Sequence, residues 1–401
     1  MKQIRVWLLA LAPLVAGACD PSGPAGCITV EGFVVLEAQA DVNAMAGVCE
    51  ITRGLEIRQA AETTDPVTTL APLSDLRTVG TSSGSALRVL STTALEGLEG
   101  LERLTLTDDA ELRFEGNAAL TSLAALGAAT VGAVTRVASL HVGANDALVD
   151  LTGVGNVLSE AGAEVTGELG VFDNPSMTTL AGLERITGRI AALLVSGLPA
   201  LGSLGTLPNV PSAGTLELSD LPFTNITVGL PSVGYLLIQD NPALTALTID
   251  VPSFGPYLRV WGNGALETLA VTTDRAPDVL TVNQSPVLAV FDLAVADGAL
   301  GAFSLTAVPA LASVGTAGLL VHDRLTLDDT GLTTLDAFTT VPALSDGLIL
   351  VGNPGLADME SFAALETADR LRIENNTALC VPAWVSGVVA TTVSISGNLC
   401  N

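Results

Sequence analysis

The chain has 401 residues, of which 49% are hydrophobic but only 3% aromatic. A core of Leu, Val, Ile and Ala suits a narrow stacked array, and this composition excludes disorder because disordered chains are poor in these residues. The formal net charge of -26 opposes binding to phosphate backbones and anionic lipid headgroups. We therefore expect no nucleic-acid partner.

The N-terminus has the three parts of an export signal. Residues 1–5 carry two positive charges, residues 6–15 are largely apolar, and residues 16–18 (Ala-Gly-Ala) form a small-residue cleavage site before Cys19. The apolar run is shorter than the roughly 20 residues needed to span a bilayer. We therefore expect residues 1–18 to be a signal peptide and the protein to be exported.

The five cysteines divide into two local pairs and one remainder. Cys27 and Cys49 precede the first clear repeat, and Cys380 and Cys400 bracket the last one. In an oxidising compartment we expect each pair to form a disulfide that closes one end of the array. Cys19 is then left unpaired at the new N-terminus.

Residues 15–19 resemble a bacterial lipobox, in which the cysteine after cleavage receives a lipid. Ala16 departs from that motif, because leucine is usual at its position. One outcome is a lipid-anchored protein of the cell envelope, with residues 19–26 as anchor and tether. The other is plain cleavage and secretion. We expect the anchor, because an unpaired cysteine in an exported protein is better explained by a lipid than by a free thiol.

One pattern recurs from residue 27 to residue 401: an apolar residue, any residue, another apolar residue, then Asn or Asp and later Leu. Residues 258–266 (LRVWGNGAL) are a clear copy. From Leu169 onward the pattern returns every 20 to 24 residues, which is typical of a solenoid. We predict one all-β parallel solenoid of about 15 coils with a period of 22–23 residues. The first residues of the coils are Leu55, Leu87, Leu112, Leu140, Leu169, Leu193, Leu216, Leu236, Leu258, Leu280, Phe303, Leu325, Leu348, Leu371 and Val393.

Alternation assigns the side chains within each coil. Leu258 and Val260 should face inward, and Arg259 and Trp261 outward, because neighbouring residues of a strand point to opposite sides. Asn263 should turn the chain. Because asparagine recurs at this one phase, we interpret the set as a structural ladder rather than a ligand site. Its members are Asn117, Asn145, Asn174, Asn241, Asn263, Asn353, Asn376 and Asn398.

Two further segments refine the prediction. The coils before Leu169 are longer and less regular, which we interpret as loops or an extra short strand around residues 104–106 (Leu-Thr-Leu). The return stretch 249–256 contains two prolines and a glycine, so it cannot form a regular helix. Short extended pieces are expected there.

These repeats resemble the receptor L-domain family, a relative of the leucine-rich repeats. The resemblance covers most of residues 27–401, and the closing cysteines at 380 and 400 belong to it. It implies a right-handed β-helical solenoid, and such domains contribute to ligand recognition in growth-factor and insulin receptors. The chain departs from those receptors in its larger number of coils and its lack of a cysteine-rich module, so receptor signalling is not implied.

A search for catalytic groups favours a protein that is not an enzyme. His141 and His322 lie in different coils without further metal ligands at suitable spacing, so no metal or cofactor is expected. Asp328 and Glu374 share one outward phase but lie two coils apart, roughly 10 Å. A β-helical polysaccharide lyase or hydrolase remains the third alternative.

The outward positions of the strands are the better candidates for function, since solenoids bind through such surfaces. Several are apolar, and we single out Phe172, Leu194, Leu237 and Trp261 as a candidate ligand face. The competing interpretation is that isolated apolar side chains only favour strand formation. The sequence thus predicts a non-catalytic surface protein that binds protein or glycan, or alternatively a structural spacer without a specific ligand.

Overall fold

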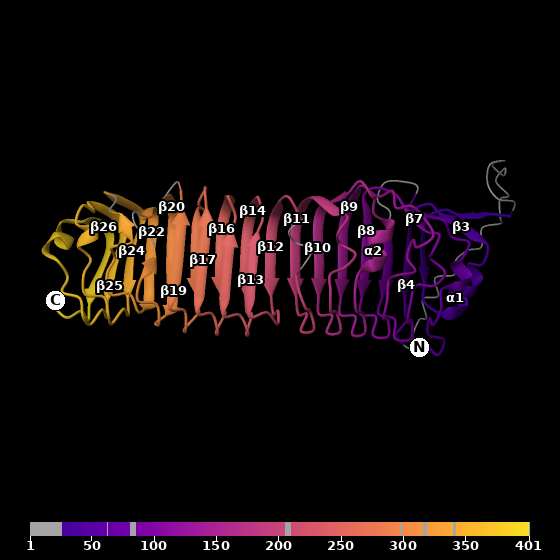
Figure 1. Cartoon of the computed structure of the whole chain (residues 1–401), viewed down its shortest axis with the longest axis horizontal. Coiled ribbons are helices and arrows are strands. Elements are labelled where there is room, and N and C mark those ends of the chain that lie inside the picture. Colours follow the sequence, from indigo (N-terminus) through magenta and orange to yellow (C-terminus); the bar gives the residue numbers. More distant parts are fainter. Residues whose placement is uncertain are drawn as a thin grey trace, which may run out of the picture.

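The computed structural model describes residues 26–61, 63–80, 86–204, 210–296, 299–315, 319–339 and 342–400. The chain winds as a right-handed, all-β parallel solenoid of about 16 turns with a period of about 22 residues. Figure 1 shows the coils following one another along the long axis. The fold class predicted from the repeat is therefore confirmed. The signal peptide, Cys19 and all of the tether except Gly26 lie outside the described residues.

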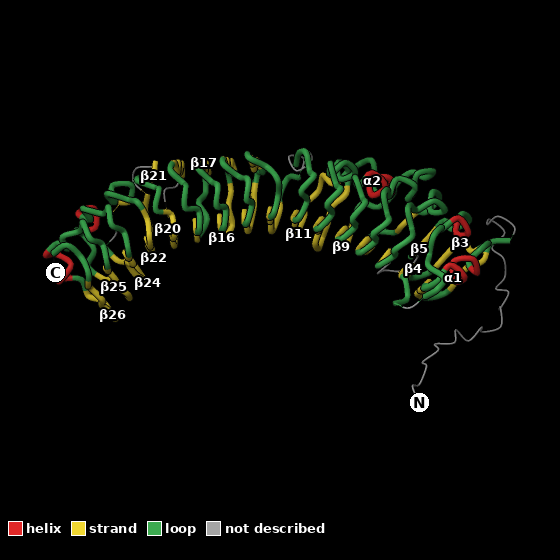
Figure 2. The backbone as a smooth tube through the Cα atoms, turned by 90° about the horizontal axis from the view of Figure 1, so that it is seen from below, coloured by secondary structure: helices red, strands yellow, loops and turns green. Residues whose placement is uncertain are grey.

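One long parallel sheet contains a strand from every turn. Figure 2 shows that the coils form an arch and that this sheet lines its inner, concave side. Its strands are, in order, β2 (Phe33–Leu36), β4 (Gly54–Arg58), β6 (Ala86–Leu90), β8 (Ala110–Glu115), β9 (Arg136–Gly143), β10 (Ala163–Phe172), β11 (Ile186–Ser196), β12 (Ala213–Ser219), β14 (Ser232–Gln239), β16 (Ser253–Trp261), β18 (Val279–Asn283), β20 (Ala299–Val308), β22 (Leu319–Thr330), β24 (Ala343–Val351), β25 (Thr367–Glu374) and β26 (Val389–Ser396).

The register of this sheet places the predicted coil leaders in one row. Leu55 pairs with Leu87, and the row continues through every predicted leader to Val393. The row also begins one coil earlier, because Val34 of β2 pairs with Leu55. This coil, which lacks the asparagine after its strand, makes the number of turns one larger than predicted.

Two smaller parallel sheets and a few short helices occupy other sides of the coils. The return stretches at the N-terminal end contain β1 (Ile28–Val30), β3 (Val48–Ile51), β5 (Thr78–Val79) and β7 (Thr105–Leu106), so the extra strand expected near residue 105 is present. The middle coils contain β13 (Asn225–Gly229), β15 (Ala246–Asp250), β17 (Thr268–Thr273), β19 (Val290–Val295) and β21 (Val314–Gly315), and β17 and β21 lie on the convex side in Figure 2. The remaining elements are β23 (Phe338–Thr339), α1 (Gln39–Ala44), α2 (Thr152–Val157), and the 3-10 helices η1 (Ala71–Leu73), η3 (Glu360–Phe362) and η4 (Ala383–Gly387).

From β6 onward, the turn that follows a main strand differs from the predicted one. In the coil of Asn263, the left-handed residue is Gly262, with φ of 67°, rather than the asparagine itself. Asp240 before Asn241 and Asn375 before Asn376 also have positive φ. Glycine, asparagine and aspartate tolerate this conformation and supply the bend in most coils. Ser91, Ala144, Gln284 and Ala307 hold the same left-handed position in four others. The asparagine after the left-handed residue forms hydrogen bonds to neighbouring coils instead.

The asparagines form a buried ladder, as predicted. Asn117, Asn145 and Asn174 are fully buried. The backbone N–H and the side-chain amide of Asn117 both donate to Oδ1 of Asn145, at 3.1 and 2.9 Å, and Asn145 donates in the same way to Asn174. Each side-chain amide also donates to a strand carbonyl, that of Val89 in the case of Asn117. The ladder therefore satisfies polar groups at a turn that water cannot reach.

Both predicted disulfides are formed. Cys27 is bonded to Cys49, and Cys380 to Cys400, with sequence separations of 22 and 20 residues. Each bond joins neighbouring coils at one end of the described chain. The cross-links therefore restrict the terminal coils, which have a packed neighbour on one side only.

Candidate functional site

The four predicted candidate residues all lie on the concave face but do not form one patch. Phe172 of β10 and Trp261 of β16 occupy the same row, separated by the outward residues of three strands. Leu194 and Leu237 occupy the neighbouring row, with Glu217 of β12 between them. All four apolar side chains are half-buried. The prediction that they point outward is therefore confirmed, whereas a continuous apolar surface is not seen.

Phe172 is covered by its own surroundings. A side chain at Gly143 would come within 2.1 Å of the Phe172 ring, so the ring lies directly over this glycine of the adjacent strand β9. The absence of a side chain at Gly143 thus makes room for Phe172 on the sheet. We therefore assign Phe172 a packing role on the concave face.

A cluster of larger side chains lies on β14 and β16. Tyr235 and Tyr257 are paired across the two strands, are both exposed, and stack with ring centroids 5.4 Å apart at an interplanar angle of 17°. On β16 the guanidinium carbon of Arg259 lies 4.6 Å from the centroid of the Trp261 ring. We call Tyr235, Tyr257, Arg259 and Trp261 the aromatic cluster.

The position of the two tyrosines in the repeat also predicts that they face outward. Both stand directly before a coil leader, Leu236 or Leu258, and they are the only tyrosines of the chain. A residue before the leader faces outward just as the residue after it does. Counting only the positions that follow the leader therefore found Trp261 and missed the tyrosines.

Packing within the aromatic cluster determines which parts are available to a ligand. The two tyrosines cover one ring face of each other, and Arg259 covers one face of Trp261. The indole N–H of Trp261 is buried and has no hydrogen-bond partner within the described part of the chain. Beside the cluster, the amide of Gln239 donates to Glu217 at 2.7 Å. The group therefore combines preorganised aromatic surface with a cation and a neighbouring carboxylate.

The concave face near the N-terminal end is charged instead. Arg88 bridges Glu111 and Glu56, with N–O distances of 2.7 and 3.4 Å, although Glu56 is largely buried. Arg58 contacts Glu37 at 2.6 Å and Glu56 at 3.1 Å. These opposite charges neutralise one another across neighbouring coils. This region is thus a network of internal ion pairs and offers its cations little opportunity to bind an anionic ligand.

The two carboxylates considered for glycan chemistry are placed as predicted. Asp328 on β22 and Glu374 on β25 lie in one row with Val351 between them. Glu374 accepts a hydrogen bond from Arg372 and another from Ser394, and these bonds hold the pKa of Glu374 below its ordinary value. Because Glu374 is ionised at neutral pH, it does not suit the role of a general acid.

The histidines are also far apart in the fold. His141 lies on β9, where Nε2 is 3.2 Å from a carboxylate oxygen of Glu168, whereas His322 lies on β22. Within the described ranges, no group of three or more His, Cys, Asp or Glu side chains is arranged to hold a metal ion.

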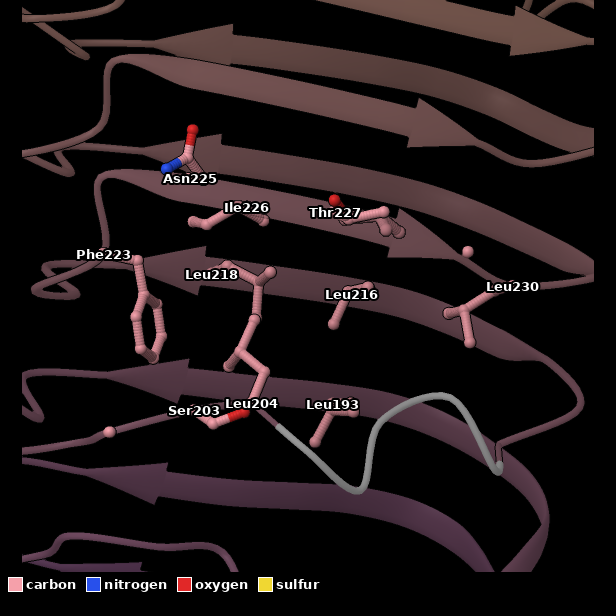
Figure 3. A pocket seen from close by; sticks show the side chains of 13 residues that line it. Leu193, Ser203, Leu204, Leu216, Leu218, Phe223, Asn225, Ile226, Thr227 and Leu230 are labelled. Carbon is pink, nitrogen blue, oxygen red and sulfur yellow. The ribbon is translucent and has the colours of Figure 1, made fainter.

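A cavity of about 380 Å³ lies inside the solenoid where β13 begins (Figure 3). Its walls are mainly inward-facing aliphatic side chains such as Leu193, Leu216 and Ile226, with Phe223 at one end. Ser203 and Leu204 also line it and directly precede residues 205–209, which lie outside the described residues. Among the described residues no charged side chain contributes to the walls, and we assign the cavity no ligand.

Comparison with protein-family models, with characterised proteins and with solved structures gives no significant match for this chain. The helices α1 and α2 have six residues each, and no helix in the described part of the chain could cross a membrane.

Proposed function

We propose that the chain is a non-catalytic surface protein that binds a protein ligand on its concave face, through the aromatic cluster. The observation that supports this most is the concentration of Tyr235, Tyr257, Arg259 and Trp261 on two adjacent strands, in a chain with only 3% aromatic residues. Tyrosine, tryptophan and arginine are the residues most enriched at the energetic centres of protein interfaces.

The exposed geometry favours a protein over a glycan. A sugar ring stacks on an open aromatic face, and one face of each ring in the cluster is already covered, by the other tyrosine or by Arg259. What remains outward includes ring edges, hydroxyl groups and guanidinium donors, which suit the mixed polar and apolar surface of a protein. The rigid sheet holds these groups in place, so little conformational entropy is lost on binding.

We also propose that the protein is exported and anchored to a membrane by a lipid. Export by residues 1–18, and a lipid on Cys19 with residues 19–26 as tether, would hold the arch at a membrane with its concave face available. The resemblance of the repeats to receptor L-domains supports a recognition role of this kind. Expression with the native leader, followed by the mass of the N-terminal peptide, tests the anchor: an unmodified Cys19 would contradict it.

Site-specific photo-cross-linking on intact producing cells tests the binding site. A photoreactive residue replaces Leu237, which lies between the two halves of the aromatic cluster, and the matched control replaces Val290, an exposed residue of β19 in the second sheet. We expect a discrete, protease-sensitive adduct from position 237 that is absent at position 290 and is lost when Tyr257→Ala is added.

The other outcomes separate the alternatives. A protease-resistant adduct that a glycosidase removes would replace the protein ligand with a glycan. Equal adduct levels at positions 237 and 290, or none at either, would contradict binding at the concave face and favour a structural spacer.

A further inference from the structure

The last turn of the solenoid exposes side chains that the neighbouring turn buries. Val393 and Ile395 of β26 are 58% and 37% exposed, whereas their register partners Leu371 and Ile373 of β25 are 1% and 0% exposed. Leu399, in the closing segment, is also exposed. Within the described part of the chain β26 pairs with β25 alone, so its other edge presents free backbone donors and acceptors beside an apolar surface.

The opposite end of the solenoid is partly covered, although the inward Val34 of β2 is only half-buried. Helix α1 follows β2 directly and packs against it, with Val42 fully buried. The inward Leu36 of the first main strand is 3% exposed, in contrast to its counterparts in β26. Head-to-tail stacking would pair β26 with the end that α1 partly covers, whereas pairing of like ends joins two uncovered apolar surfaces.

Charge distinguishes the C-terminal end from the rest of this acidic chain. No Asp, Glu, Lys or Arg follows Glu374, although the whole chain carries a formal net charge of -26. Exposed sheet edges usually carry charges that prevent pairing with another chain. This edge carries none, and two copies can approach there with the least mutual repulsion.

We propose that two copies of the chain dimerise tail to tail, with their β26 strands paired antiparallel about a two-fold axis at Ser394. This register places Val393 of each copy opposite Ile395 of the other, and Thr392 opposite Ser396. Inward apolar residues then meet apolar residues, while hydroxyl side chains meet on the concave face. The two hydrophobic cores become continuous, and both concave faces point to the same side of the dimer.

Cysteine cross-linking in the full-length chain tests this register. Residues directly opposite in antiparallel strands have Cα atoms about 4.5 to 5.5 Å apart, within reach of a disulfide, so Ser394→Cys should form a covalent dimer under mild oxidation. The matched variant Ser396→Cys places the two thiols about 13 Å apart along the strand, too far to bond. The unchanged chain accounts for any dimer formed through Cys19.

Non-reducing electrophoresis distinguishes the outcomes. A covalent dimer from Ser394→Cys alone supports the proposal. Cross-linking of both variants to the same extent, or of neither, overturns the register, and cross-linking of Ser394→Cys to a different protein shows that another partner covers this end.

Sedimentation provides a measurement that does not depend on disulfide formation. Val393→Lys puts a charge at the exposed end, where the monomer leaves it in solvent, and the control Val290→Lys changes an exposed valine of similar environment within the solenoid. In a buffer with a mild detergent, we expect the unchanged chain and Val290→Lys to sediment as dimers and Val393→Lys as a monomer. A monomeric unchanged chain, or a dimeric Val393→Lys, would refute the interface.

Discussion

Replacing Asn145 by alanine tests whether the asparagine ladder stabilises the solenoid. Asn145 is fully buried and accepts two hydrogen bonds from Asn117, one from the backbone N–H and one from the side-chain amide. It also donates to the carbonyl of Phe114. Asn145→Ala leaves both donors of Asn117 without an acceptor in a place where water cannot enter. At about 1 to 3 kcal/mol for each buried unpaired group, the expected loss of stability is about 4 kcal/mol.

Urea unfolding followed by far-ultraviolet circular dichroism measures this loss. For a slope of about 3 kcal/mol per molar urea, the midpoint should fall by about 1 M. The control is Ser285→Ala, at the same ladder position of another coil, where the buried hydroxyl has no partner among the described residues. Its removal should leave the midpoint unchanged or slightly higher. Equal midpoints for the two variants would refute the argument that ladder hydrogen bonds hold neighbouring coils together.

Three further substitutions test other features. Gly182→Ala should destabilise the fold by about 3 kcal/mol, because Gly182 has φ of 111° and a new methyl group would lie 1.9 Å from a backbone oxygen. The control Gly264→Ala has open space around the new methyl group, so its thermal unfolding midpoint should be unchanged. Arg136 hydrogen-bonds Asp109 and lowers its pKa, so this pair stabilises the fold above the unfolded pKa and loses its effect as the pH falls through the folded one. Arg136→Ala should therefore shift the Asp109 titration, followed by NMR, to higher pH, and an unchanged titration would contradict the pairing. Trp261→Ala should cost less than about 1 kcal/mol in thermal unfolding, because the ring lies outside the core; a larger loss would assign it a structural role.

Periodicity predicted the main sheet almost completely, because one inward row must continue through all coils. The row from Leu55 to Val393 is that predicted. The coil of Val34 was missed, although its register partner Leu55 was predicted from a coil that also lacks the asparagine turn.

Other features depended on contacts that a sequence pattern does not encode. The left-handed residue was assigned to Asn263 rather than Gly262, because either residue type tolerates this conformation. Phe172 was predicted to be outward, but its position over Gly143 depends on the register of β9 and β10. The stacking of Tyr235 on Tyr257 likewise depends on the pairing of two strands 22 residues apart.

The asparagine ladder is interrupted at two places, and these interruptions should divide the solenoid into units that unfold separately. Leu198 and Leu221 take the position between Asn174 and Asn241, and Ser285 and Val308 take it between Asn263 and Thr330. Within each unbroken run the amide dipoles point the same way and reinforce one another. Among the described residues no side-chain amide pair crosses either break, although the backbone N–H of Leu221 donates to Oδ1 of Asn241 at 3.0 Å. In native-state hydrogen exchange we therefore expect three cooperative opening units rather than one, with the least protected amides at the boundaries between them.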